Sequence, residues 1–183
     1  MIPLPDPPLA DGRVRLRPWR DADAGALVAA WSDPEVVRWT AVPPDPSPAV
    51  ARRWIAGDPQ RRREHLSLDL VICEDGAAHR DDDDSGAAPQ VCGEVGLAGF
   101  RPGSRVAMIG YWAAPHRRGT GMTSAAVELV ATWALATLDL DALVALCDPR
   151  NPAAVAVAAG RGFVEARVAD DGRRILVRRR AAR

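Results

Sequence analysis

The chain has 183 residues, of which 48% are hydrophobic, so it is long enough to bury the core of one domain. Its 24 basic residues are all arginines and are balanced by 24 acidic residues, which leaves no net charge to favour binding to nucleic acid or an anionic membrane. No apolar stretch approaches the roughly 18 residues of a membrane span, and the N-terminus lacks the pattern of a signal peptide, so we expect a cytoplasmic protein.

The N-terminal third of the chain is predicted to form one strand and several helices. Residues 13–19 alternate apolar side chains with arginines, which is the period of a half-buried strand. Helices are expected over 21–31, 32–39 and 48–57. The third of these begins where Ser47 can cap a helix and Pro48 takes its first position, and Gly57 ends it.

Three strand-like runs follow in the middle of the chain. Residues 66–74, 90–100 and 105–114 are mostly apolar and are separated by turn-forming residues. The connection at 75–89 is acidic and rich in Gly, Ala and Pro, and we interpret it as a mobile hairpin loop. Its four consecutive aspartates at 81–84 are more typical of a solvated segment than of a metal site, so no bound metal is expected.

The C-terminal part alternates helices and strands. We expect a helix over 122–138, a buried strand over 142–148, a helix over 151–162 and a hairpin over 163–179. Asn151 caps the second helix ahead of Pro152, and the hairpin turns at Asp171 and Gly172. The predicted order is therefore strand, helices, three strands, helix, strand, helix and two strands.

Three cysteines, Cys73, Cys92 and Cys147, are spread widely along the chain. An odd number at such spacing matches neither a disulfide framework nor a zinc motif. Each lies in an apolar run, so we expect buried free thiols.

A charged glycine turn stands between the strand at 105–114 and the helix at 122–138. It reads "HRRGTGM", with Gly119 and Gly121 directly before the helix. The first amides of a helix lack intrahelical partners, the helix dipole favours negative charge, and glycine lets a bulky anion approach the backbone. The combination predicts a phosphate site, although its spacing matches neither a P-loop nor a Rossmann fingerprint. Taken alone, the turn also fits a plain connection between strand and helix.

Longer stretches around this turn resemble a known family. The segment "IGYWAAPHRRGTGMTSAA", followed further on by "CDPRNPAAVAVAAGRGF", resembles the GNAT superfamily of acyl-CoA-dependent N-acetyltransferases. The opening "GRVRLRPWRDADAGALVAAWSDPEVVRWT" is similar to the RimJ/RimL-like branch, which contains the ribosomal-protein N-terminal acetyltransferases. The resemblance covers nearly the whole chain, from about Val14 to Arg178.

The resemblance implies a fold of the α/β (α+β) class. Its central mixed sheet would have six to seven mostly antiparallel strands, splayed between strands four and five and flanked by about four helices. It also implies that residues 1–183 form a single acyl-CoA-binding domain. Because proteins of this family are often dimers, a homodimer is a further expectation.

The resemblance also implies acetyl-CoA as the co-substrate. Main-chain groups of Trp112 and Ala113, on strand four, would bind the pantetheine arm as an added strand would. The turn would hold the diphosphate through Arg117, Arg118, Gly119, Thr120, Gly121 and Met122. Asn151 matches an asparagine that touches the pantetheine, a role compatible with capping its helix. His116 replaces the usual Gln or Arg of the loop, which matters little because main-chain amides do most of the binding.

The positions that transfer protons in relatives are apolar in this chain. Glutamates that act as the base on strand four or five of relatives are matched by Met108 and Leu146. The acids that protonate the leaving group are matched by Ala154 and Ala158. The only tyrosine, Tyr111, fits core packing better than proton donation.

Two functional readings follow from these substitutions. In the first, an N-acetyltransferase positions the amine beside the thioester, the Ala113 amide stabilises the oxyanion, and water or Glu94 accepts the proton. Glu94 is an acid in an otherwise small and apolar run, which also fits simple exposure to solvent. The unused base positions favour water slightly. In the second reading, the chain binds acetyl-CoA as a sensor or interaction module with little or no catalysis.

The acceptor amine is expected between the first helices and the C-terminal hairpin, as the family implies. Trp31, Trp39 and Trp54 are concentrated in the first helices together with Arg38, and aromatic walls suit an amine or a peptide N-terminus. Tryptophans at such spacings are also typical of a core. A protein N-terminus, an aminoglycoside, a polyamine and an amino acid all fit these residues, whereas no nucleic-acid or membrane partner is expected.

Overall fold

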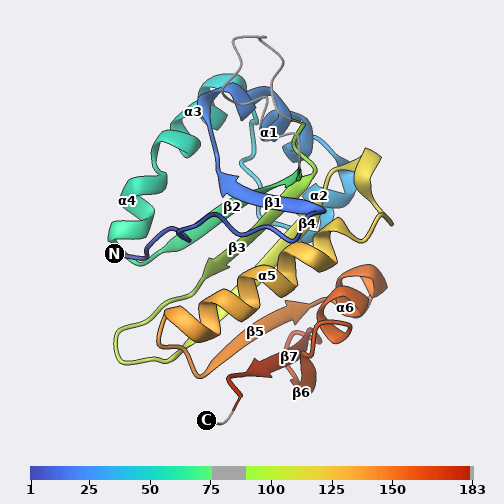
Figure 1. Cartoon of the computed structure of the whole chain (residues 1–183). Helices are drawn as coiled ribbons and strands as arrows, with labels where there is room; N and C mark the ends of the chain where they lie inside the picture. The colour runs from blue at the N-terminus through green and yellow to red at the C-terminus, as the bar shows by residue number, and fades with distance from the viewer. Residues whose placement is uncertain (76–89, 182–183) are drawn as a thin grey trace.

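The structure is a computed structural model that describes residues 1–75 and 90–181 (Figure 1). Its strands and helices follow one another in the predicted order. Apart from Asp75, the predicted loop at 75–89 lies outside the described residues, as do the aspartates at 81–84. Within the described ranges, no group of His, Cys, Asp and Glu is placed to hold a metal ion, and no helix is long and apolar enough to cross a membrane.

Seven strands in the described part of the chain form one sheet, in the order β1-β2-β3-β4-β5-β7-β6. They are β1 (Val14–Pro18), β2 (Ser67–Glu74), β3 (Gly93–Ala98), β4 (Val106–Ala113), β5 (Ala142–Cys147), β6 (Val164–Val168) and β7 (Arg174–Arg179). All neighbours are antiparallel except β4 and β5. These two pair only over Val106–Met108 and Ala142–Val144, although β4 continues to Ala113 and β5 to Cys147. The predicted mixed sheet, splayed between its fourth and fifth strands, is confirmed.

The helices begin at caps that the sequence marks. Within the described residues they are α1 (Ala24–Trp31), α2 (Pro34–Trp39), α3 (Pro48–Ala56), α4 (Asp58–Arg63), α5 (Met122–Thr137) and α6 (Pro152–Ala159). The predicted caps Ser47 and Asn151 accept first-turn amides at 3.3 and 3.0 Å. Asp33 caps α2 in the same way at 3.1 Å. Each cap satisfies an amide that the helix itself leaves unpaired.

The short helix α4 is not predicted by the sequence analysis. Gly57 does end α3, but it keeps a right-handed helical conformation (φ −77°), so the chain turns directly into α4. An ion pair between Arg62 and Asp58, four residues apart with a 2.8 Å contact, supports the new helix. The residues of α4 show no apolar period, which is why the pattern of hydrophobic residues does not reveal it.

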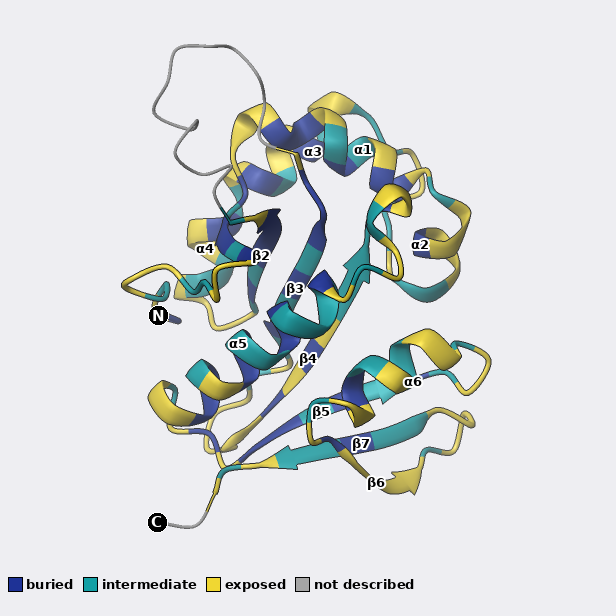
Figure 2. Cartoon of the chain, turned by 45° about the vertical axis from the view of Figure 1, so that its right-hand side comes forward, coloured by how far each residue is buried: buried dark blue, intermediate teal, exposed yellow. Residues whose placement is uncertain are grey.

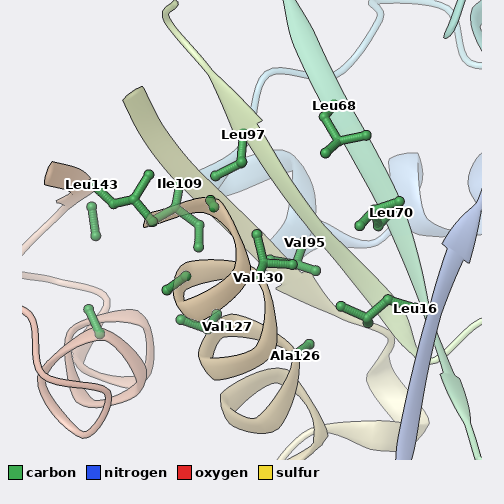
Figure 3. Packing of buried hydrophobic residues seen from close by; sticks show 14 of the residues in the cluster. Leu16, Leu68, Leu70, Val95, Leu97, Ile109, Ala126, Val127, Val130 and Leu143 are labelled. Carbon is green, nitrogen blue, oxygen red and sulfur yellow. The ribbon is translucent and has the colours of Figure 1, made fainter. Parts of the chain in front are cut away.

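Alternate side chains of the sheet enter two separate hydrophobic clusters. On one face Leu68, Leu70 and Ile72 pack in the cluster that contains α5 (Figure 3). On the other face Val71 and Cys73 pack with residues of α1 and α3. The three cysteines are buried and free, as predicted. Burial falls off toward the last hairpin, where every residue of β6 is exposed (Figure 2).

Candidate functional site

A pocket of about 430 Å³ lies where β4 and β5 separate. The end of β4, at Tyr111, Trp112 and Ala113, forms its wall on the sheet side. The other walls come from α2, from α6 and from the glycine turn before α5. In Figure 2, α2 and α6 are both drawn to the right of β4, with α2 above α6. The splay therefore opens a groove along the strand that was predicted to bind a pantetheine arm.

The glycine turn presents the start of a long helix to this pocket. Gly119 and Gly121 both have positive φ angles, +73° and +80°, which only glycine adopts readily. α5 then runs for 16 residues, and no side chain caps its first amides. A Cβ atom placed on Gly119 would meet no atom within 4 Å, so the space beside it is open. This geometry has the features of an anion site at a helix N-terminus.

The arginines of the turn are already paired with acidic and polar groups. Arg117 contacts Glu74 at 2.6 Å and donates to Gln90 at 2.5 Å. Arg118 forms an ion pair with Asp33, the residue that caps α2. A bound diphosphate would have to compete with these partners for the arginine side chains.

The sequence analysis missed one further arginine, Arg13, that lies at this turn. Arg13 donates a hydrogen bond to the carbonyl oxygen of Thr120 and lies 3.5 Å from the position of a Cβ on Gly121. No local pattern could have revealed it, because Arg13 precedes β1 and reaches the turn only once the sheet has formed. It adds a third positive side chain beside the helix N-terminus.

Main-chain amides at the end of β4 point alternately toward β3 and into the splay. The Ala114 amide donates to the carbonyl oxygen of Cys92 at 2.9 Å, toward β3. Successive amides of a strand point to opposite sides, so the Ala113 amide is directed away from β3, into the splay. Asn151 lines the same pocket while its side chain caps α6.

A second pocket, of about 440 Å³, adjoins the first and shares Thr40, Tyr111 and Trp112 with it. It lies on the face of the sheet that carries Asp69 and Glu94, under the segment that follows α2. The shared wall is the place where a group bound in one pocket can meet a group bound in the other. The two pockets thus provide the arrangement that transfer between two bound molecules requires.

Glu94 lies at the floor of the second pocket and is held by two indoles. Trp19 donates to its Oε2 at 2.7 Å, and Trp112 donates to its Oε1 at 3.2 Å. Burial, reinforced by the nearby Asp69 carboxylate, raises the pKa of Glu94 to about 8, while the two indole N–H groups act in the opposite direction. A carboxyl group with such a pKa can both accept and release a proton near neutral pH.

Asp69, the second acid of this pocket, has its own partners. Arg61 approaches it at 3.4 Å, and the Ser67 hydroxyl donates to it at 2.7 Å. Burial nevertheless raises the pKa of Asp69. Arg61 also stacks on Trp54, with its guanidinium carbon 4.2 Å from the ring centroid.

The tryptophans named in the sequence are divided between the two pockets. Trp31 and Trp54 line the second pocket and contact each other edge to face at 6.0 Å between ring centroids. Trp31 is also buried in the core, and its contact with an acceptor stays a prediction. Trp39 lines the first pocket instead, and Arg38 lines neither pocket but lies over the Trp39 ring at 4.5 Å. The structure therefore places Arg38 against Trp39, whereas Trp31 lines the other pocket.

The positions that match the proton-transferring residues of relatives carry no acidic side chain in this chain. The Tyr111 hydroxyl donates to the carbonyl oxygen of Ala154 at 2.7 Å, and burial raises its pKa. Met108 is 43% exposed, and Ala158 is fully buried. Glu94, in contrast, is a carboxyl group that contacts the shared wall directly, through its hydrogen bond from Trp112.

Comparison with protein families agrees with this architecture. Residues 13–164 match the model of the acetyltransferase (GNAT) domain, which covers most of the chain. The protein belongs to this family of acetyl-CoA-dependent acetyltransferases. No curated protein sequence matches the chain.

Solved structures share the fold at low sequence identity. A ribosomal-protein-S5-alanine acetyltransferase from Vibrio fischeri has a TM-score of 0.77 and 16% identity, over 94% of this chain and 96% of that one. Mycobacterium smegmatis RimJ, in complex with CoA-disulfide, has a TM-score of 0.70 and 23% identity, over 90% and 79%. The spermidine N-acetyltransferase of Vibrio cholerae, in complex with CoA and spermine, has a TM-score of 0.72 and 14% identity, over 93% and 97%. The same fold thus serves protein and small-molecule acceptors.

Proposed function

We propose that the protein transfers an acetyl group from acetyl-CoA directly to a primary amine, on a small molecule or a protein N-terminus, while both are bound. The observation that carries this proposal is the meeting of the two pockets at Thr40, Tyr111 and Trp112. The first pocket offers the glycine turn for the diphosphate and the edge of β4 for the pantetheine arm. The second offers a carboxylate and aromatic walls for the amine.

Two steps of the transfer, proton removal and oxyanion stabilisation, have a candidate group in the described residues. The amine enters the second pocket as an ammonium ion and gives its proton to Glu94, which frees the nitrogen lone pair. The nitrogen then attacks the thioester carbonyl, and the Ala113 amide donates a hydrogen bond to the developing oxyanion. Collapse of this intermediate breaks the carbon–sulfur bond and forms the amide, and the second proton lost by the nitrogen passes through water to the departing thiolate.

The location and pKa of Glu94 support it as the proton acceptor over bulk water. Its pKa of about 8 lies close to that of an α-amino group, so proton transfer between the two is nearly balanced. Its two indole donors fix the carboxylate at the shared wall, since Trp112 lines both pockets. A water molecule would have no such fixed position.

A turnover assay tests the proposal. The full chain is mixed with acetyl-CoA and a panel of amines and N-terminal peptides, and free thiol and acetylated product are both measured. Direct transfer predicts product with at least one amine, intersecting initial-rate lines, and no acetylated protein when the amine is omitted. Acetylation of the protein itself, or parallel lines, would contradict direct transfer. Binding of acetyl-CoA without turnover of any amine would favour the sensor reading.

A further inference from the structure

The ionisable groups in the described lining of the second pocket include two carboxyl groups and no base. Asp69 and Glu94 are these carboxyl groups, and no arginine or histidine is found in the described lining. Glu94 becomes negative as the pH approaches about 8, or when it gives up its proton to a bound amine. Arg61 lies outside this lining, 3.4 Å from the Asp69 carboxylate, and donates to the carbonyl oxygen of Trp54 at 2.6 Å. The lining itself therefore favours a positively charged ligand over a negatively charged one.

The walls of the pocket are flat and apolar. Trp31, Trp54 and Trp112 contribute aromatic surface, and Val42 and Pro43 add further apolar lining. An ammonium ion is stabilised both by a carboxylate and by the faces of indole rings. The remainder of such a ligand would bury apolar surface against the same rings.

Two glycines create the hollow in which the body of a ligand would lie. Gly96 and Gly110 stand opposite each other on β3 and β4, beside Glu94. A Cβ on Gly110 would meet no atom within 4 Å, so the space above it is empty of protein. A Cβ on Gly96 would lie 2.9 Å from the Asp69 carboxylate, so this glycine leaves room for the acid. A volume of about 440 Å³ suits a compact molecule.

We propose that the acceptor is a compact primary amine with an apolar or aromatic body and no acidic group beside the amine. It binds with its nitrogen at Glu94 and its body over Gly110, against the surface formed by Trp31 and Trp54. A carboxylate next to the amine would lie close to the Glu94 and Asp69 carboxyl groups, which disfavours free amino acids. This inference rests on the proposed acetyl transfer and specifies its acceptor.

Matched pairs of amines test the role of the acid. Tyramine is compared with tyrosine, and phenethylamine with phenylalanine, because the members of each pair differ only in the carboxylate. We expect kcat/KM, measured by thiol release from acetyl-CoA, to be at least about 100-fold higher for the member without the carboxylate. Spermidine and an N-terminal tripeptide are included and are expected to be poorer substrates than tyramine.

The outcomes separate this inference from the proposed function. Turnover of tyrosine within threefold of tyramine, or preference for spermidine or the tripeptide, would overturn the acceptor class while leaving acetyl transfer intact. Absence of thiol release with every amine, including these, would overturn both.

A substitution at Gly110 tests where the body of the amine lies. In Gly110→Val the added methyl groups fill the hollow, so kcat/KM for tyramine should fall at least tenfold, whereas that for ethylamine should change less than threefold. The affinity for acetyl-CoA should stay within twofold, because Gly110 does not line the first pocket. Gly25→Val is the control, since Gly25 also has open space around it but lies in α1, outside both pockets. An unchanged kcat/KM for tyramine in a folded Gly110→Val protein would contradict this placement.

Discussion

The two pockets that meet at Trp112 are built by different means. The first presents main-chain groups: the start of α5, two glycines with positive φ and the unpaired edge of β4. Its arginine side chains are paired with acids. The second presents side chains, with a carboxylate held by two indoles under aromatic walls. A site made of main-chain groups suits a ligand group that does not vary, such as a diphosphate. A site made of side chains changes with substitutions, so it can determine which amine is accepted.

The largest expected effect comes from a substitution that disrupts the main-chain site. Gly121→Glu should abolish acetyl-CoA binding, raising the Kd by more than about 100-fold, because the side chain adds bulk and negative charge where the diphosphate would lie. Calorimetric titration with acetyl-CoA measures the change. Gly172→Glu is the matched control, since Gly172 has a similar φ of +84° in a hairpin turn outside both pockets. Equal losses in the two variants would attribute the effect to backbone strain instead of the site.

The next effect concerns the side-chain site. Glu94→Gln should lower kcat about 100-fold while the Kd for acetyl-CoA is unchanged, because the amide cannot accept the proton. In the native protein the rate should rise with pH through about 8, as Glu94 loses its proton, and this limb should be absent from the variant. Glu165→Gln, on the exposed strand β6, serves as the control. The same limb in all three proteins would indicate that ionisation of the free amine controls the rate.

The same residue makes stability depend on pH. The pKa of Glu94 is about 8 in the folded protein, above its usual value of 4.5, so the folded state holds an extra proton between these values. The free energy of unfolding should therefore fall as pH rises from about 5 to 8, by at most about 1.4 kcal/mol per pH unit from this group. Urea unfolding of the native and Glu94→Gln proteins at several pH values measures the difference. A constant difference across this range would mean that Glu94 is not protonated in the folded state.

The smallest expected effect concerns the arginine side chains of the glycine turn. Arg118→Ala should raise the Kd for acetyl-CoA only about threefold, because the native arginine must leave Asp33 before it can contact a phosphate. Asp33→Asn should act in the opposite direction and lower the Kd by a similar factor, since asparagine still caps α2 but no longer holds the arginine. A loss of binding as large as that of Gly121→Glu would mean that the arginine, and not the main chain, is the principal ligand.

The sequence by itself determined the features that depend on neighbouring residues. The order of strands and helices, the caps Ser47 and Asn151 and the turn at Asp171 and Gly172 all follow from local periodicity and local hydrogen bonding. The glycine turn was recognisable for the same reason, because the amides that would bind an anion there belong to residues adjacent in the sequence. The helix α4 was the exception, since no apolar period marks it.

Only the tertiary structure decided how the side-chain site is assembled. Trp19 reaches Glu94 across 75 positions of sequence, and Arg118 reaches Asp33 across 85. The pKa of Glu94 depends on burial and on Asp69 of the neighbouring strand, neither of which the run around Glu94 reveals. Pairing of β2, β3 and β4 places Asp69, Glu94 and Trp112 on one face of the sheet. The register of this pairing is fixed by packing between elements far apart in the chain.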